Sequence, residues 1–261
     1  MANSSILIKL GGTAATNAVG LEMLARELAT VSGPIAIVHG GGKEVSDVSR
    51  RFGLEPIFHE GIRMTSEEEM DVVEMILCGL ANKRLVRRLL RAGVNAVGVS
   101  GADGGMVTGA RIDDANGAPS RTAKVASLNP FLVRDLWVCG YVPVIASPAS
   151  DASGEAVNIN ADDIAFSLAG AMGVGSLLFL SDVAGVLIDG EPVSSLTPAM
   201  ASAQIAGGEI TGGMIPKVQN AMTAIEAGVA QVVIGSYERR GDLKALLEGR
   251  RGTAIIPGDK P

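Results

Sequence analysis

Short apolar runs rich in β-branched residues alternate along the chain with stretches in which apolar residues recur at helical spacing. The runs Ser5–Leu10 and Pro34–His39 have the length and composition of buried strands, and Leu21–Val31 between them has an apolar helical face. Further strands are predicted at Val94–Val99, Tyr141–Ala146, Ser176–Leu180 and Gln231–Ile234. Further helices are predicted at Glu44–Phe52, Ser66–Leu80, Asn82–Ala92, Asn129–Gly140, Ala161–Met172, Thr197–Ile205, Lys217–Ala227 and the C-terminal end. This alternation predicts an α/β protein, a three-layer α/β/α sandwich with a mainly parallel central sheet.

Two local signals add detail to this pattern. Ser66, followed three residues later by Glu69, has the spacing of a capping box and marks a helix start. Within Val107–Ser127, the run Asp113–Gly117 is a strong turn signal between strand-like pieces, which predicts a small β-hairpin. No internal repeat or low-complexity linker is visible, so residues 1–261 are taken as one domain.

Composition and charge exclude several classes of protein. The chain has 261 residues, 47% of them hydrophobic, and its net charge of −6 argues against a general nucleic-acid binder. Cys78 and Cys139 lie in apolar runs, as reduced core cysteines do, and no Cys/His spacing typical of a metal site is present. The uncharged stretch Ile164–Ser181 is interrupted by glycines and predicts a helix and a buried strand, not a membrane span. With no signal peptide recognisable at the start, we expect a cytoplasmic protein without membrane contact.

Three familiar glycine motifs are incomplete in this sequence. A P-loop fails because Glu44 follows Gly42-Lys43, where Ser or Thr is required. The dinucleotide-binding fingerprint fails because Val45 occupies the position of its last glycine. Gly98–Ala102 is not a nucleophile elbow, since Ala102 replaces the closing glycine.

Four loops that follow strand-like runs carry the remaining chemistry. They are Lys9-Leu10-Gly11-Gly12, His39-Gly40-Gly41-Gly42, Asn158-Ile159-Asn160-Ala161-Asp162 and Gly212-Gly213-Met214-Ile215-Pro216-Lys217. In a parallel sheet such loops share one edge, where glycine N–H groups and helix N-termini approach phosphate oxygens. Each cluster alone is most simply a turn, Lys9 alone a surface residue at a strand end, and Asp162 alone a helix-start residue. Two lysines with one acid among these glycines suit phosphoryl transfer, which needs charge neutralisation and alignment.

Taken together, these segments resemble the acetylglutamate kinases of the amino-acid kinase family. The matching runs are Ile6–Gly12, Ile37–Gly42, Gly61–Thr65, Asn82-Lys83, Val97–Gly101, Val157–Asp162, Leu180–Leu187 and Gly212–Lys217. They stand in the family's order and spacing across nearly the whole chain. The resemblance implies an open α/β/α sandwich with the amino-acid substrate and dimerisation surface in an N-terminal lobe of about residues 1–175 and ATP in a C-terminal lobe of about residues 176–261.

The resemblance also implies roles for individual residues. Lys9 and Lys217 would stabilise the transferring phosphoryl group, and Asp162 would hold these lysines in place. Arg63 and Asn158 would bind the substrate's α-carboxylate. The phosphoryl path would be lined by the backbone of Gly11 and Gly12 on the ATP side and of Gly41 and Gly42 on the substrate side. The nucleotide pocket would be lined by Asp182, Val183, Ala184, Gly185, Val186, Leu187, Glu209, Ile210 and Thr211.

The activity implied is ATP-dependent phosphorylation of the side-chain carboxylate of N-acetyl-L-glutamate to N-acetylglutamyl 5-phosphate, in arginine biosynthesis. Mg²⁺ would bridge the β- and γ-phosphates, with no metal site of the protein's own. Arginine-inhibited members carry an extra N-terminal helix, whereas here only four residues precede the first strand. We therefore expect a homodimer that is insensitive to arginine. The Ser66–Leu80 helix, with Met70, Val73, Met75 and Leu77, would supply apolar dimer surface or else intramolecular core.

One segment departs from the family pattern. The second strand of the middle hairpin usually reads Gly-x-x-Gly-Glu-Val, and here it reads Ser120-Arg121-Thr122-Ala123-Lys124-Val125. Drift in a mobile flap would explain the change, as would an altered acyl substrate or a larger acidic partner. The acyl group and the chain length of the substrate stay open.

Other functions remain as alternatives. Kinases that act on an N-blocked 2-aminoadipate, free or carried on a protein, tend to have Arg-Tyr-Thr where this chain has Arg63-Met64-Thr65. Aspartokinases share the Lys9–Thr13 start but carry appended regulatory domains. A non-catalytic metabolite sensor would not need Lys9, Asp162 and Lys217 together.

Overall fold

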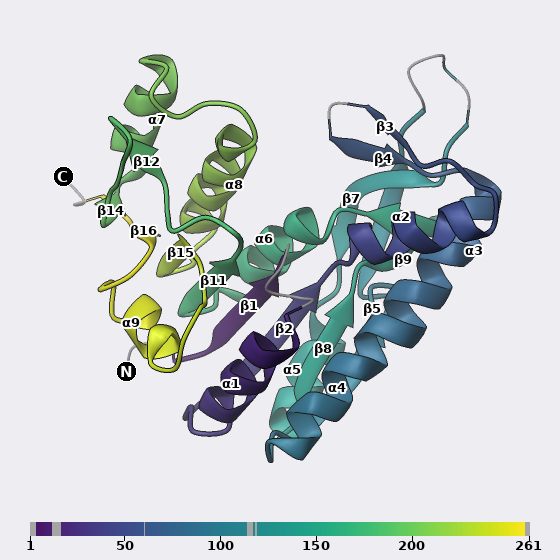
Figure 1. Cartoon of the computed structure of the whole chain (residues 1–261), viewed down its shortest axis with the longest axis horizontal. Coiled ribbons are helices and arrows are strands. Elements are labelled where there is room, and N and C mark those ends of the chain that lie inside the picture. Colours follow the sequence, from purple (N-terminus) through teal and green to yellow (C-terminus); the bar gives the residue numbers. More distant parts are fainter. Residues whose placement is uncertain (1–3, 12–16, 60, 114–116, 118, 259–261) are drawn as a thin grey trace. The chain divides into compact units, whose positions relative to one another are not determined.

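The computed structural model describes residues 4–11, 17–59, 61–113, 117 and 119–258 (Figure 1). The chain divides into two compact units. Unit 1 comprises Met1–Ile35, Ala92–Val94 and Ala165–Pro261, and unit 2 comprises Ala36–Arg91 and Asn95–Ile164. Gly12 and part of the predicted turn at residues 113–117 lie outside the described residues.

Unit 1 is built on strands in the order β14, β16, β15, β11 and β1. Their bounds are β1 Ile6–Leu10, β11 Ser176–Leu180, β14 Ser195–Leu196, β15 Gln231–Gly235 and β16 Thr253–Ile255. β1, β11 and β15 are parallel, whereas β16 pairs antiparallel with β15. A two-stranded ribbon lies outside this sheet, formed by β12 Leu187–Ile188 and β13 Glu191–Pro192. The predicted parallel core of buried apolar strands is confirmed here.

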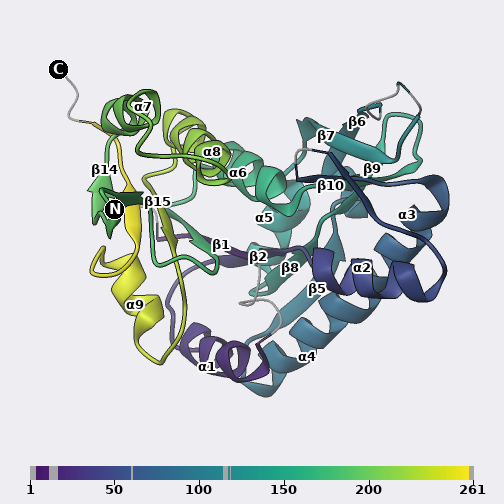
Figure 2. The same ribbon diagram turned by 45° about the horizontal axis from the view of Figure 1, so that its top comes forward.

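Helices cover both faces of the unit 1 sheet (Figure 2). α1 (Ala18–Leu28) and α9 (Asp242–Leu247) lie on one face, and α6 (Ala161–Met172), α7 (Pro198–Ala206) and α8 (Met214–Glu226) lie on the other. α1 begins three residues before its predicted start because the Asn17 side chain accepts hydrogen bonds from the backbone N–H groups of Val19 and Gly20.

Unit 2 combines a parallel sheet with a small barrel. β2 (Ile35–His39) and β5 (Ala96–Ser100) both pair in parallel with β8 (Val142–Ala146). The helices α4 (Asn82–Arg91) and α5 (Phe131–Val138) pack on β8. The predicted hairpin is confirmed as the antiparallel pair β6 (Val107–Arg111) and β7 (Thr122–Leu128). β9 (Pro148–Asp151) and β10 (Ala156–Ile159), which the sequence did not reveal, close it into a barrel. A Cβ atom at Gly109 would lie 2.9 Å from the Ala123 Cβ, so glycine lets the barrel close.

One long helical segment dominates the outside of unit 2. α3 (Glu67–Glu74), a π-helical stretch (Met75–Ala81) and α4 (Asn82–Arg91) follow one another without a break, and Figure 1 shows them as one rod. The hydroxyl of Ser66 accepts from the backbone N–H of Glu69 at 3.1 Å, which confirms the predicted helix start. Two shorter elements precede the rod, namely α2 (Gly42–Arg51) and the hairpin of β3 (Ile57–His59) and β4 (Ile62–Met64).

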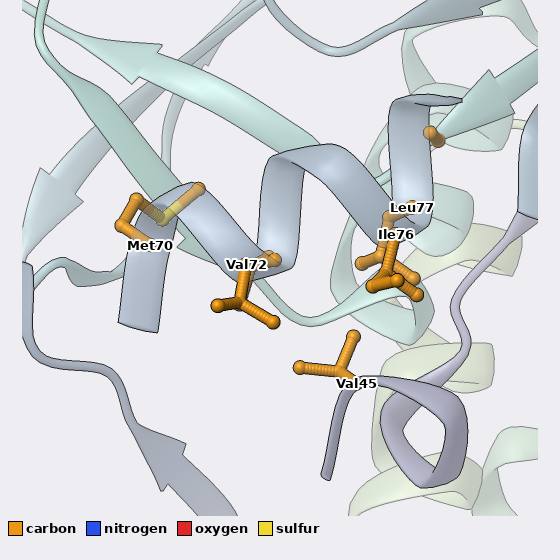
Figure 3. Packing of buried hydrophobic residues seen from close by; sticks show 7 residues of the cluster. Val45, Met70, Val72, Ile76 and Leu77 are labelled. Atoms are coloured by element: carbon orange, nitrogen blue, oxygen red, sulfur yellow. The ribbon is translucent and has the colours of Figure 1, made fainter. Parts of the chain in front are cut away.

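The inner side of this rod packs into the core of unit 2 (Figure 3). Val45 of α2 faces side chains of α3 and of the π-helical stretch, in a cluster that is at least 90% buried. Its members are Val45, Met70, Val72, Val73, Ile76, Leu77 and Ala146. Of the four apolar residues that could have formed either dimer surface or intramolecular core, Met70, Val73 and Leu77 are therefore intramolecular core. Only Met75, with 53% of its surface exposed, remains on the outside.

Within the described ranges, the structure contains no helix with the length and apolar character that crossing a membrane requires. The uncharged stretch Ile164–Ser181 divides into α6 and β11, as predicted.

Candidate active site

Two lysines that are far apart in the sequence converge on one aromatic ring in unit 1. The Nζ of Lys9, on β1, lies 4.6 Å from the centroid of the Phe179 ring, and the Nζ of Lys217, on α8, lies 5.7 Å from the same centroid. Phe179 is the register partner of Lys9 on β11, and its ring stacks on Phe166 of α6 at a centroid distance of 5.3 Å. Because two like charges share this place, the local potential favours an anionic ligand.

Gly11 leaves room for the Lys9 ammonium group directly after β1. A Cβ atom at Gly11 would lie 2.2 Å from the Nζ of Lys9, so a side chain here would displace the ammonium group. The backbone N–H of Gly11 donates to the carbonyl of Leu180 at 3.0 Å, which ties this turn to the neighbouring strand. Gly11 is therefore required for the observed position of Lys9.

Lys217 is the fourth residue of α8, a position that opposes the helix dipole. No acidic side chain lies in the first turn, and the N-cap residue Gly213 supplies no side-chain hydrogen bond. A cation at a helix N-terminus is unfavourable for the helix, so this placement indicates a ligand-binding role. The ammonium group at this place suits a phosphate. In the preceding loop, Glu209 accepts from the backbone N–H of Asp189 at 3.4 Å, which links it to the β12–β13 turn.

The predicted nucleotide segment, residues 182–187, is held by a residue that the sequence did not reveal. The hydroxyl of Thr253, at the start of β16, accepts from the backbone N–H of Val186 at 2.8 Å and donates to the carbonyl of Val193. The side chains of Val186 and Ile210 are fully buried, so a ligand would meet these two residues only through their backbone. The exposed members of the segment are Asp182, Val183, Ala184 and Leu187.

A cavity of about 220 Å³ lies beside this segment within unit 1. It is lined by Asn17, Gly20, Leu24, Leu180, Ser181, Asp182, Ser236, Tyr237 and Glu238. The hydroxyl of Ser181 is buried there without a hydrogen-bond partner among the described residues, so it can bond to a ligand. Of this lining, only Asp182 was predicted. Ser236 and Tyr237 follow β15 as Ser181 and Asp182 follow β11, so the rule that parallel strands share a ligand-binding edge could have found them.

The glycine loop of unit 2 is positioned by His39. The Nδ1 of His39 lies 3.0 Å from the carbonyl of Gly40, and its Nε2 lies 3.1 Å from the amide nitrogen of Asn82. The same atom also donates to the carbonyls of Val99 and Val144. Because carbonyls only accept, these bonds fix the orientation of the Asn82 side-chain amide, with its NH₂ group toward His39. Nε2 is therefore an acceptor, and Nδ1 carries the proton that is donated to Gly40. A neutral imidazole thus fixes the start of the loop.

Protonation of His39 is expected to destabilise the folded protein at mildly acid pH. Burial, as the largest cause, lowers the pKa of His39 below its ordinary value of 6.5. Below that value the unfolded chain binds a proton that the folded chain does not, so this contribution to stability is lost as the pH falls toward the folded pKa. The loss reaches at most about 1.4 kcal/mol per pH unit. Urea unfolding at about pH 7.5 and about pH 5.5 should show a smaller pH dependence for His39→Gln than for the wild type. An equal decrease in the free energy of unfolding of the two proteins would show that His39 does not cause the pH dependence.

Gly41 and Gly42 leave the start of α2 open. A Cβ atom at Gly41 would lie 2.8 Å from the Cδ2 of Leu77, whereas Gly42 has open space around it. The first turn of α2 has no side-chain cap, so its N–H groups can bind an anion. This arrangement is compatible with the predicted role of these two glycines.

Arg63 is buried and its guanidinium is held by several groups. One terminal nitrogen donates to Glu69 at 2.6 Å, and the other donates to the carbonyl of Gly42 at 2.9 Å and the hydroxyl of Ser46 at 2.5 Å. The group also lies 4.8 Å from the centroid of the Phe58 ring. Sequence reasoning placed Glu69 in a capping box, but its carboxylate is the ion-pair partner of Arg63.

Asn158 lies on β10 in the same unit. Its side-chain nitrogen donates to the hydroxyl of Thr65 at 2.9 Å, and its backbone N–H donates to the carbonyl of Arg121 at 2.8 Å. Thr65 stands two residues after Arg63, so the two predicted carboxylate-binding residues are joined through one short segment.

Asp162 lies in the first turn of α6, where its backbone N–H donates to the side chain of Asn160 at 3.0 Å. It belongs to unit 2, whereas Lys9 and Lys217 belong to unit 1, and its contact with these lysines stays a prediction. Among the residues that the structure describes, no group of three or more His, Cys, Asp or Glu could hold a metal ion.

Comparison with known proteins identifies the family. The model of the "Amino acid kinase family" matches residues 4–236. Acetylglutamate kinase from Chloroflexus aurantiacus is 40% identical over 229 residues, which cover 87% of this chain and 90% of that protein. Acetylglutamate kinase from Rubrobacter xylanophilus is 39% identical over 253 residues, or 96% of each chain.

A solved structure has the same fold. The protein smu.665 from Streptococcus mutans superposes with a TM-score of 0.80 at 27% identity, over 98% of this chain and 99% of that one. This chain belongs to the amino-acid kinase family and has its α/β/α fold with a mainly parallel sheet. It is a kinase, and membership of the family implies the use of ATP.

Proposed function

We propose that this chain is an acetylglutamate kinase of arginine biosynthesis, which phosphorylates the side-chain carboxylate of N-acetyl-L-glutamate at the expense of ATP. The observation that carries the proposal is the convergence of Lys9 and Lys217 on Phe179 in a chain about 40% identical to acetylglutamate kinases. Two fixed ammonium groups supply the charge that phosphoryl transfer requires.

The reaction is one displacement at phosphorus. A side-chain carboxylate oxygen of the substrate attacks the γ-phosphorus, a new O–P bond forms, and the bond to the β-phosphate oxygen breaks to release ADP. Lys9 and Lys217 stabilise negative charge on the transferring group, and no covalent enzyme intermediate is needed. Asp162 orients the lysines in this proposal.

Substrate recognition is assigned to unit 2. Arg63 and Asn158 bind the α-carboxylate, and the backbone of Gly41 and Gly42 lies along the phosphoryl path. The guanidinium has five N–H donors, and its three bonds to Glu69, Gly42 and Ser46 leave others that can donate to a substrate carboxylate.

Nucleotide binding is assigned to unit 1. Gly11 is assigned to the phosphates because it adjoins the Lys9 ammonium group, and the absence of a side chain at Gly11 leaves that group in place. Asp182–Leu187, with the loop Glu209–Thr211, contacts the remainder of the nucleotide. ATP would enter as its Mg²⁺ complex, in which the ion neutralises charge on the phosphates, since the described residues include no group of three or more His, Cys, Asp or Glu that could hold a metal ion.

The substrate is tested by trapping the acyl phosphate with hydroxylamine. Purified protein with Mg-ATP is offered N-acetylglutamate, N-acetyl-2-aminoadipate, glutamate and aspartate in parallel. We expect hydroxamate from N-acetylglutamate and little from free glutamate, whose ammonium group would need a counter-charge. Equal or faster turnover of N-acetyl-2-aminoadipate would show that the assigned substrate is wrong, whereas the assigned phosphorylation of a carboxylate would stand.

The protein is also proposed to form a homodimer, through the outer face of the rod formed by residues 67–91. Exposed apolar side chains, Met75, Leu80 and Leu90, lie along the rod, whose start is acidic and whose end is basic. Two antiparallel copies related by a twofold axis would set opposite charges against each other. Light scattering should give about twice the chain mass of 26.6 kDa. The chain mass itself, or a hexamer, would contradict this assembly.

A further inference from the structure

The atypical segment Ser120–Lys124 forms internal contacts with both residues assigned to the substrate's α-carboxylate. We propose that Thr122 and Arg121 of this segment are positioning residues, which hold Arg63 and Asn158 in the arrangement that carboxylate recognition requires. The inference rests on the proposed function of Arg63 and Asn158, and it assigns to this chain's own residues a role in substrate affinity.

Thr122 fixes the backbone on both sides of Met64. Its hydroxyl donates to the carbonyl of Arg63 at 2.7 Å and accepts from the backbone N–H of Thr65 at 2.8 Å. Thr122 is 3% exposed, so water cannot readily replace these bonds. A hydroxyl has one proton, and here that proton is committed to Arg63. Together with the pairing of Arg63 and Phe58 between β4 and β3, Thr122 therefore fixes the backbone from which the Arg63 side chain extends.

Arg121 joins the same segment to Asn158 through its backbone. Its N–H donates to the carbonyl of Thr65 at 2.8 Å, and its carbonyl accepts from the N–H of Asn158 at 2.8 Å. Asn158 is also the register partner of Thr122 in the parallel pairing of β10 and β7. The bond from the Asn158 side chain to the Thr65 hydroxyl closes the network. Arg63 is thus attached to Thr122, the first residue of β7, and Asn158 to Arg121, the residue directly before it.

The Arg121 side chain secures this network from outside. Its two terminal nitrogens pair with Glu67, at the start of α3, and with Glu155, just before β10, the latter at 3.0 Å. The side chain is only 12% exposed. Because both carboxylates belong to unit 2, the guanidinium is already neutralised within the fold. The positive charge of Arg121 is therefore paired with two carboxylates of the same unit. This pairing argues against Arg121 as a contact for a large acidic partner.

The expected consequence is a selective loss of substrate affinity. A receptor whose two binding groups are held at a fixed separation avoids the cost of ordering them on binding. Removing the Thr122 hydroxyl leaves the Arg63 carbonyl and the Thr65 N–H without their partner, so both groups shift. We expect the KM for N-acetylglutamate to rise about tenfold or more, while kcat and the KM for ATP stay within about threefold.

The test compares Thr122→Val, which removes the hydroxyl at constant shape, with Thr122→Ser, which keeps it. Thr108→Val, on the neighbouring strand β6 of the same barrel, serves as a matched control. The inference predicts a raised KM for N-acetylglutamate in Thr122→Val, a KM within about threefold of the wild type in Thr122→Ser, and no change in Thr108→Val. If Thr122→Val does not fold, Arg121→Gln is measured instead and should raise the same KM.

Several outcomes would overturn the inference. An unchanged KM for N-acetylglutamate in folded Thr122→Val, equal rises of both KM values, or a serine variant as impaired as the valine variant would each exclude a positioning role. The proposed function is tested separately, by the turnover of N-acetylglutamate in the wild-type protein. Absence of that turnover would contradict the proposed function, whatever the variants show.

Discussion

Replacement of Lys217 by alanine is expected to lower kcat by roughly 10²–10³, because one preorganised cation near the transferring phosphoryl group is lost. The free energy of unfolding should not decrease. Lys217 stands in the first turn of α8, where a positive charge opposes the helix dipole, so the variant should be as stable as the wild type or slightly more stable. Steady-state kinetics with N-acetylglutamate and urea unfolding together measure the two effects.

The matched control for this variant is Lys244→Ala. Lys244 lies on α9 of the same unit, is 75% exposed and pairs only at 3.8 Å with Glu248, so its loss should change neither quantity measurably. Lys9→Ala should lower kcat on the same scale as Lys217→Ala, since both ammonium groups lie over Phe179. A Lys217→Ala enzyme with near-normal kcat would refute the assigned chemistry.

Replacement of Arg63 by alanine is expected to reduce stability by about 3–5 kcal/mol, because it leaves the carboxylate of Glu69 buried without its ionic partner. Glu69 is 3% exposed and its pair with Arg63 is 2.6 Å long. The KM for N-acetylglutamate should rise in the same variant. Urea unfolding measures the first effect and initial-rate kinetics the second.

A double variant separates the two roles of Arg63. In Arg63→Met with Glu69→Leu, both charges are replaced by apolar groups, which should recover much of the lost stability. The KM for N-acetylglutamate should remain high, because no guanidinium is left to bind its carboxylate. A double variant with a normal KM would show that Arg63 stabilises unit 2 but does not bind the substrate.

Elements with strong local signals were predicted closely. The helix Ala161–Met172 and the strand Ser176–Leu180 have the predicted bounds, because a long apolar run is broken by glycines at the point where the helix ends. β14, β16, β9 and β10 were missed. Each has only two to four residues, and such short strands form because a partner strand pairs with them, which periodicity alone does not reveal.

The charged residues of the candidate site could be predicted from the sequence, but the contacts that hold them in place could not. Lys9 and Lys217 follow from glycine-rich loops after strands, whereas their meeting at Phe179 depends on the register of β1 and β11. The spacing of Ser66 and Glu69 suggested a local partner for Glu69, but the structure turns its carboxylate to Arg63 and Ser49. Here a tertiary ion pair outweighed a local capping interaction. Thr253 gave no sequence signal, because a hydroxyl beside an apolar run acquires its role only from the backbone groups that the fold places around it.

The claim that this kinase phosphorylates a carboxylate is tested most directly by counting products in a single reaction. Wild-type protein, Mg-ATP and N-acetylglutamate are incubated with hydroxylamine, and the ADP released is compared with the hydroxamate formed. We predict equal amounts of the two products, both absent when N-acetylglutamate is omitted and both reduced in proportion in Lys217→Ala. Release of ADP that does not depend on N-acetylglutamate, or that is not matched by hydroxamate from any of the carboxylates tested, would contradict the account.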